Sequence, residues 1–195
     1  MSTSLPHYRF LLLSSVLVVL DQITKLWVKN TMFLGESHPM IGETVRLTFV
    51  ENPGMAFGIE FGAGKIVLTL VTIVVAGFLV WYLMRLREAH WSVQFAVCLI
   101  LAGAVGNLID RAFYGVIFNE DPLFFGKVVD FIQVDIPDIT WFGERYTHWP
   151  VFNVADSCVS VGVVTLLFVS HKLPTKSNEQ PGTPPIGTGQ DRTHA

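Results

Sequence analysis

Four long apolar stretches restrict this chain to a helical membrane fold. They occupy residues 9–29, 66–84, 93–113 and 151–171. Each is close to the ~20 residues that an α-helix needs to cross the ~30 Å hydrocarbon core of a bilayer. With 51% apolar and only 15% charged residues, the 195-residue chain is also too apolar for an ordinary soluble domain. The sequence therefore predicts an α-helical integral membrane protein with four transmembrane helices.

The first stretch must be distinguished from a secretory signal peptide. No small-residue cleavage site follows it, and Asp21 and Lys25 lie within it, so we predict a transmembrane helix. These two residues are four apart, acid before base, which is the favourable order for an ion pair on one helical face. The pair either holds the outer end of the helix in place, as structural support, or takes part in chemistry.

The segment 30–64 is too polar, and too broken by glycine and proline, to cross a bilayer. Its residues 45–49 alternate between apolar and polar, which predicts a strand in a small extracytoplasmic β-rich region. Asn52-Pro53-Gly54 follows and is a turn signal. The motif is either a plain turn or a site where the Asn52 amide, which both donates and accepts hydrogen bonds, lies near a substrate backbone.

The third stretch ends in a polar cluster. Asn107 and Asp110 are three residues apart and share a helix face, and Arg111 follows directly. These side chains either reach out to the lipid headgroups or form a polar array inside the helix bundle. Gly103 and Gly106 beside them would let another helix approach closely.

Residues 114–150 are expected to form a second extracytoplasmic loop or short helix, because Pro122 and Pro137 prevent any long helix. The four-span domain is then 1–172. Residues 173–195 have almost no apolar content and are predicted to be a disordered cytoplasmic tail.

The basic residues predict the orientation. Arg85 and Arg87 crowd the short loop between the second and third stretches, whereas the two long loops carry few basic residues. Because cytoplasmic loops are enriched in lysine and arginine, both termini should face the cytoplasm. The two long loops then lie on the outer face.

Two carboxylates border the later part of the second loop. Asp130 precedes it, and Asp156 lies five residues into the fourth stretch, ~7–8 Å below its start. Taken singly, Asp156 could be a first-turn acid favoured by the helix dipole and Asp130 an ordinary loop residue. Two carboxylates that share a site cannot both ionise easily, so one keeps its proton while the other accepts one from water. An aspartic peptidase requires such a pair, one carboxylate to activate water and one acid to polarise the scissile carbonyl.

Five short motifs occur in a fixed order across the four stretches. They are Asp21 with Thr24-Lys25, Asn52-Pro53-Gly54-Met55-Ala56-Phe57, Gly106-Asn107-Leu108-Ile109-Asp110-Arg111, Val128-Val129-Asp130-Phe131 and Phe152-Asn153-Val154-Ala155-Asp156-Ser157. Each motif alone is a weak signal. As an ordered set they closely resemble the bacterial lipoprotein signal peptidases (signal peptidase II), over about residues 9–171.

The resemblance implies an aspartic endopeptidase of the bacterial inner membrane, with its site near the outer face. Its substrate would be a prolipoprotein, cut immediately before the diacylglyceryl-modified cysteine, and membrane phospholipid would surround it. Neither a cofactor nor a metal is implied, and globomycin would be an inhibitor. By motif match, Asp130 and Asp156 would be catalytic, with Asn52 and Arg111 in contact with the substrate backbone or a lipid headgroup. The remaining matched positions would line or brace the site: Gly54, Asn107, Asp110, Asn153, Ala155, Asp21 and Lys25.

Two functions of other classes are also compatible with polar residues in apolar helices. A proton-coupled membrane carrier also places acids in apolar helices, but we would expect more spans and polar groups near the midplane. A cysteine peptidase would use Cys158 with His148. A nucleic-acid partner is not expected, because the net charge is −3 and the basic residues form no stripe.

Overall fold

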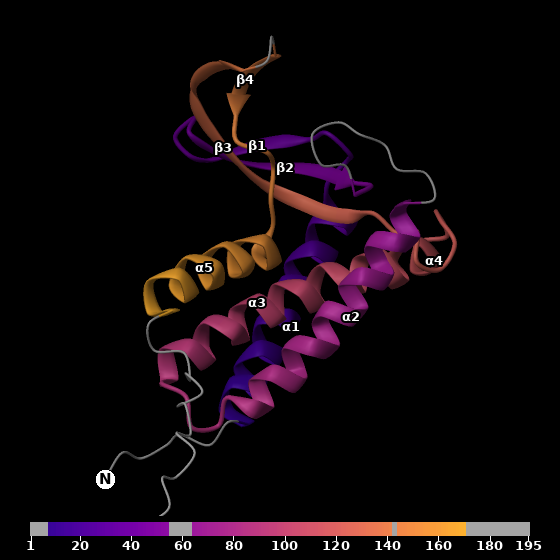
Figure 1. Ribbon diagram of the computed structural model, residues 1–195. Coiled ribbons are helices and arrows are strands. Elements are labelled where there is room, and N and C mark those ends of the chain that lie inside the picture. The colour runs from indigo at the N-terminus through magenta and orange to yellow at the C-terminus, as the bar shows by residue number, and fades with distance from the viewer. Residues whose placement is uncertain (1–7, 55–63, 142–143, 171–195) are drawn as a thin grey trace, which may run out of the picture.

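The structure, a computed structural model, describes residues 8–54, 64–141 and 144–170. The predicted tail 173–195 and the Met55-Ala56-Phe57 part of the second motif lie outside the described residues. Helices form the body of the molecule, and a β-sheet covers one end of them (Figure 1).

Three long helices match the first three predicted spans in place and type. Each is long and apolar enough to cross a membrane. The third runs without a break from Trp91 to Ile117 and contains one π-helical turn. The segments are α1 (Tyr8–Thr31), α2 (Gly64–Arg85), α3 (Trp91–Ile109), the π-turn η1 (Asp110–Tyr114) and α4 (Gly115–Ile117).

The fourth apolar helix is shorter than predicted. It is α5 (Val154–Val169), whose 16 residues span ~24 Å. The expected start at residue 151 was wrong, because Asn153 has an extended backbone and caps the helix. Its side chain accepts the Asp156 backbone N–H at 2.9 Å, and the Asp156 carboxylate accepts the Asn153 N–H at 3.3 Å. Asp156 therefore lies two residues past the helix start rather than five, and it is part of a capping box.

Helix α3 is the centre of the bundle, with α1, α2 and α5 packed against it. Gly103 and Gly106 give α5 the close approach that the sequence predicted. A Cβ at Gly103 would lie 2.3 Å from the Ala155 carbonyl oxygen, and one at Gly106 would lie 2.6 Å from the Asp21 carboxylate. The first turn of α5 thus lies directly against the backbone of α3.

Four antiparallel strands form the sheet in the order β1-β2-β3-β4. They confirm the predicted β-rich region and correct one expectation, because most of the predicted loop 114–150 is a 14-residue strand and its hairpin partner. Pro137 is tolerated within that strand because the pairing register shifts around it, between Asp135 and Ile139. The strands are β1 (Ser37–Ile41), β2 (Val45–Asn52), β3 (Val128–Trp141) and β4 (Glu144–His148).

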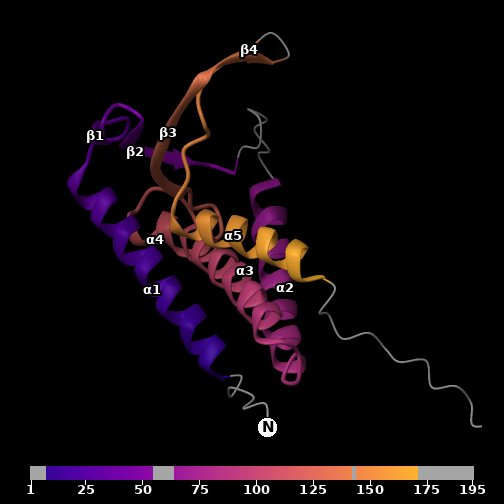
Figure 2. The same ribbon diagram turned by 90° about the vertical axis from the view of Figure 1, so that its left-hand side faces the viewer.

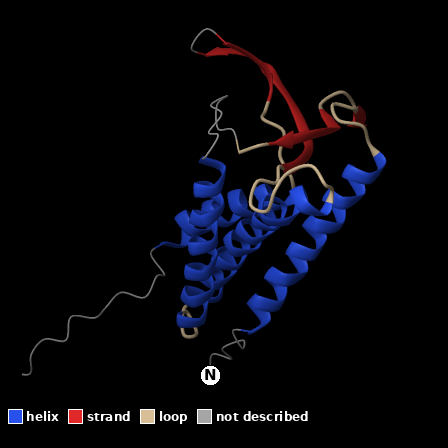
Figure 3. Ribbon diagram, turned by 90° about the vertical axis from the view of Figure 1, so that its right-hand side faces the viewer, coloured by secondary structure: helices blue, strands red, loops and turns tan. Residues whose placement is uncertain are grey.

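The sheet lies over the end of the bundle where α1 stops and α5 begins, whereas α1 starts at the opposite end (Figure 2). Viewed from the other side, the strands again lie entirely on that end of the helices (Figure 3). The polar residues of all five motifs therefore meet where the sheet joins the helices.

Candidate active site

A buried ion cluster links α1 to the end of α3. The ammonium group of Lys25, fully buried, lies 2.9 Å from Asp21 and 2.9 Å from Asp110, both of which are also buried. The predicted pair on α1 is therefore present, and Asp110 joins it. Asp21 also accepts the Ala155 backbone N–H at 2.9 Å, so a carboxylate of α1 caps the N-terminus of α5.

The π-turn η1 places Asp110 and Arg111. Its carbonyls bond to the following loop, because the Phe124 N–H donates to Ala112 O at 3.1 Å and the Gly126 N–H donates to Arg111 O at 3.0 Å. Any Cβ at Gly126 would lie 2.2 Å from Asp110 O. The Asp110 carboxylate in turn accepts the Val129 N–H at 3.1 Å, which fixes the start of β3. The cluster that ends the third span thus points into the protein and not to the headgroups.

Backbone pairing brings Asp130 and Asn153 together. Phe152 and Ile132 exchange two backbone hydrogen bonds, at 2.7 and 3.0 Å, and so fasten the segment before α5 to β3. The Asn153 amide then lies 2.7 Å from an Asp130 carboxylate oxygen. On β2, Val50 pairs with Asp130, which leaves the Asn52 side chain diagonal to it on the same face.

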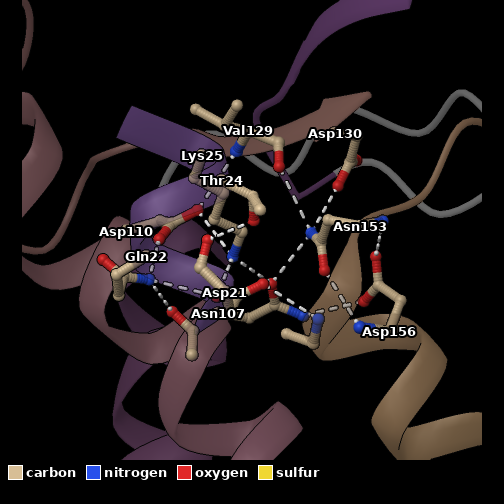
Figure 4. A network of polar contacts seen from close by, with 12 residues as sticks. Asp21, Gln22, Thr24, Lys25, Asn107, Asp110, Val129, Asp130, Asn153 and Asp156 are labelled. Atoms are coloured by element: carbon tan, nitrogen blue, oxygen red, sulfur yellow. Dashed lines mark hydrogen bonds and ion pairs between the residues drawn. The ribbon is translucent and has the colours of Figure 1, made fainter. Parts of the chain in front are cut away.

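Three asparagines turn their amide nitrogens toward the two carboxylates. Figure 4 shows two of them, Asn107 and Asn153. Asn107 Nδ2 donates to Asp156 at 2.8 Å, and Asn153 Nδ2 donates to Asp130. Asn52 also hydrogen-bonds Asp130, while its Oδ1 accepts the Gly54 N–H at 2.9 Å. Each amide oxygen is occupied by a separate donor, which leaves the nitrogen to face the acid.

Burial and a neighbouring charge act on Asp130. Burial of this side chain, which is 2% exposed, and the nearby Asp156 raise the pKa of Asp130 to about 7. The amides of Asn52 and Asn153 oppose the rise because they stabilise the ionised form. Asp156 is only half-buried and sits in the first turn of α5, where the helix dipole favours a negative charge. The two carboxyl groups are therefore in different environments.

Arg111 supplies the positive charge beside this pair. It interacts electrostatically with Asp110, Asp156 and Asp130. Its buried Nε atom has no hydrogen-bond partner among the residues that the structure describes. This N–H can therefore donate a hydrogen bond to an acceptor atom of a ligand.

Two supporting groups were not predicted from the sequence. Gln22 donates from Nε2 to Asp21 at 3.1 Å and to Asp110 at 3.0 Å, and its only sequence signal is a polar residue next to Asp21 in an apolar helix. Glu51 binds Lys29 and, at 3.2 Å, Lys127. Burial opposes but does not outweigh these bonds, which lower the pKa of Glu51. The ion pairs hold the end of β2 next to Asn52, and nothing in their sequence spacing indicates them.

The arrangement does not favour a cysteine nucleophile. Cys158 is buried on α5 at 8% exposure, whereas His148 is exposed at the end of β4 and bonds to the neighbouring Trp149 carbonyl at 3.1 Å. A nucleophile and its base must lie within hydrogen-bonding reach of each other. The described carboxyl groups and amides are the better candidates for chemistry.

Comparisons with known proteins match most of the chain. The family model described as signal peptidase (SPase) II matches residues 13–172. A lipoprotein signal peptidase of Porphyromonas gingivalis is 39% identical over 90% of this chain and 88% of its own length. One from Syntrophus aciditrophicus is 37% identical over 83% of this chain and 91% of its own.

A solved structure has the same fold. A bacterial membrane enzyme determined at 1.9 Å by the in meso method superimposes with a TM-score of 0.65 at 31% identity, over 85% of this chain and 94% of that one. The protein is thus a multi-pass bacterial membrane enzyme with a helical fold. The chain belongs to the signal peptidase II family of aspartic peptidases, the lipoprotein signal peptidases, which cleave signal peptides from prolipoproteins.

Proposed function

We propose that Asp130 and Asp156 form the catalytic pair of this signal peptidase. The observation that carries the proposal is that one residue, Asn153, bonds to both. Its side chain donates to Asp130, and its side-chain oxygen and backbone N–H hold Asp156 in the capping box. Two carboxyl groups held on one asparagine, one from the sheet and one from α5, are what general acid–base hydrolysis of a peptide requires.

The two environments assign the roles. Asp130 is buried and its pKa is about 7, so it holds the shared proton and donates a hydrogen bond to the scissile carbonyl oxygen. Asp156 is half-buried at the first turn of α5, and in this proposal it is the base that takes a proton from the attacking water. The water oxygen bonds to the carbonyl carbon while the proton of Asp130 passes to the carbonyl oxygen, which gives a tetrahedral diol. The C–N bond then breaks as the proton held on Asp156 passes to the leaving amine and one diol hydroxyl returns its proton to Asp130, which leaves the new carboxyl end and restores the pair.

Other matched residues contact the substrate or brace the pair in this proposal. Arg111 and Asn52 bind the substrate backbone or a lipid headgroup, and the Nε of Arg111 has no partner within the described part of the chain. Gly54 shapes the turn that holds Asn52, since its φ is +92° and a side chain there would be strained. The others line or support the site: Asn107, Asp110, Asn153, Ala155, Asp21 and Lys25.

The substrate in this proposal is a prolipoprotein whose cysteine carries a diacylglyceryl group, cut just before that cysteine. A lipid-anchored chain diffuses in the bilayer plane, so its scissile bond arrives near the interface. The pair lies where the helices meet the sheet, which supports a site near the outer face (Figure 2). With α5 as a fourth crossing, both termini lie in the cytoplasm of a cell whose inner membrane holds the enzyme. Globomycin is expected to occupy the same site, and phospholipid the surrounding apolar faces.

Cleavage in detergent tests this function. Purified protein incubated with a diacylglyceryl-modified prolipoprotein should release the signal peptide, and mass spectrometry should place the cut immediately before the modified cysteine. The same substrate without the lipid should be cut far more slowly. A proton-coupled carrier has no compartments to act between in detergent, so intact substrate after long incubation would favour the carrier over the peptidase.

The role of Asp130 also predicts the pH dependence. Because Asp130 acts in its protonated form, kcat/KM should fall as the pH rises through about 7. Asn52→Ala removes a donor that stabilises ionised Asp130, so the alkaline limb of the profile should move to higher pH. The measurement is kcat/KM against pH for both proteins. An alkaline limb that stays in place, or moves to lower pH, would contradict the role given to Asp130.

A further inference from the structure

Lys25 makes one contact that charge balance does not require. Its three ammonium hydrogens bond to Asp21, to Asp110 and to the side-chain oxygen of Asn107, each at 2.9 Å. Two carboxylates already exceed its single positive charge. The bond to the neutral Asn107 therefore leads out of the ion cluster and toward the catalytic pair.

That bond decides which way the Asn107 amide faces. The oxygen and nitrogen of an amide are almost the same in shape, so only their neighbours set the orientation. Lys25 can only donate, and the Asn153 amide donates to the same Asn107 oxygen at 3.1 Å. The Asn107 nitrogen is left to donate to Asp156 at 2.8 Å. In the reversed orientation, an NH₂ group would face the ammonium and an oxygen would face the carboxylate.

We propose that Lys25 is a positioning residue of the proteolytic reaction: it fixes the amide of Asn107 in the orientation that donates to Asp156, and so keeps Asp156 the base of the pair. This inference rests on the proposed catalytic pair. It gives a reaction role to a fully buried lysine that touches neither aspartate of that pair.

The charges around Asp156 show why this donor matters. Asp130 on β3 is negative when ionised and disfavours a second charge, whereas Arg111 on η1 favours it. Lys25 and Asp21 on α1, and Asp110 on η1, lie behind Asn107. Asn107 on α3 is the side-chain donor between that cluster and Asp156. Loss or reversal of its amide would replace an attractive dipole with a repulsive one.

The sharpest test is Asn107→Asp. The new carboxylate keeps both acceptor contacts, to Lys25 and to Asn153, and it turns an acceptor with a negative charge toward Asp156 in place of a neutral donor. We expect the acid limb of kcat/KM against pH to move up by about one pH unit or more, which is about a tenfold loss on that limb. A uniform loss of activity with an unmoved acid limb would overturn the proposal, since a merely structural role predicts it.

Variants of Lys25 separate orientation from charge balance. Lys25→Met should shift the acid limb in the same direction, and Lys25→Arg, which also only donates, should restore part of it. The double variant Lys25→Met/Asp110→Asn removes one charge of each sign, so it should stay shifted if orientation is the role. A double variant with the wild-type limb would overturn the proposal, because charge balance would then account for Lys25. Where Lys25→Met does not yield folded protein, Asn107→Asp decides alone.

Lys29→Met is the matched control. Lys29 lies one turn further along α1 and is also ion-paired, but its partners are Glu51 and Glu120. The acid limb of Lys29→Met should lie at the same pH as that of the wild type. A shift as large as that of Lys25→Met would overturn the proposal. Failure of the catalytic pair itself would look different, because Asp156→Asn would then keep its turnover, whereas failure of this inference alone leaves that variant inactive.

Discussion

Replacing Asp130 or Asp156 with asparagine is expected to abolish turnover. Each substitution keeps the size of the side chain but removes a group that carries a proton in the reaction. One general acid or base contributes about 10²–10⁴-fold to a rate, so each single variant should lose about 10²–10⁴-fold in kcat. The kcat of the double variant should be only slightly lower than that of the less active single variant, because the two groups act as a unit.

Asp135→Asn provides the matched control for this loss. Asp135 lies on the same strand as Asp130, five residues later, but its side chain is exposed and away from the three amides. Its kcat should stay within about twofold of the wild type, as is usual for a surface substitution. All variants should bind globomycin and elute as monodisperse protein in detergent. Near-normal turnover in Asp130→Asn or Asp156→Asn would remove that residue from the mechanism.

Gly103→Ala is expected to cost both stability and activity. Its Cβ would lie 2.3 Å from the Ala155 carbonyl oxygen and 2.4 Å from Val159 Cγ2, so α5 must move away from α3. Overpacking of this kind costs about 1–3 kcal/mol of folding free energy. The displaced turn carries Asp156, and a shift of about 1 Å at a catalytic group can cost about 10²-fold in rate. Thermal unfolding in detergent and kcat measure the two effects.

Gly77→Ala controls for the loss of a helical glycine. Gly77 lies within α2, and a Cβ there meets no atom within 4 Å. Alanine also favours the helix over glycine by about 1 kcal/mol, so this variant should be as stable as the wild type or more so. If Gly103→Ala were equally well tolerated, the close contact of α3 and α5 would not be needed to position Asp156.

The helical class and the approximate spans could be predicted because they depend on local composition. An apolar run of bilayer length dictates a helix wherever it occurs in the chain. The ion pair of Asp21 and Lys25 was predictable for the same reason, since a separation of four residues on a helix fixes the distance. The start of α5 was missed because apolar Phe152 pairs with β3 instead of joining the helix, and pairing is not a local property.

The second long loop, residues 114–150, shows more clearly what local sequence cannot predict. Its three acids and Pro137 weaken any strand signal in residues 128–141. The strand forms because β2 pairs with its residues 128–134 and β4 pairs with its residues 135–141, with a register shift around the proline. The sequence of residues 128–141 alone does not indicate that β2 and β4 will pair with it.

The sequence by itself determined the membrane class, the order of the five motifs and the chemical types available for catalysis. The tertiary structure alone decided that Lys25 binds Asn107 across 82 residues of sequence, that Asp21 caps α5 across 134, and that one asparagine holds both carboxyl groups. The physical reason is that hydrophobic periodicity specifies which face of a helix is buried, but not which polar group it meets there. That choice depends on close packing at Gly103 and Gly106 and on the pairing of β3 with Phe152.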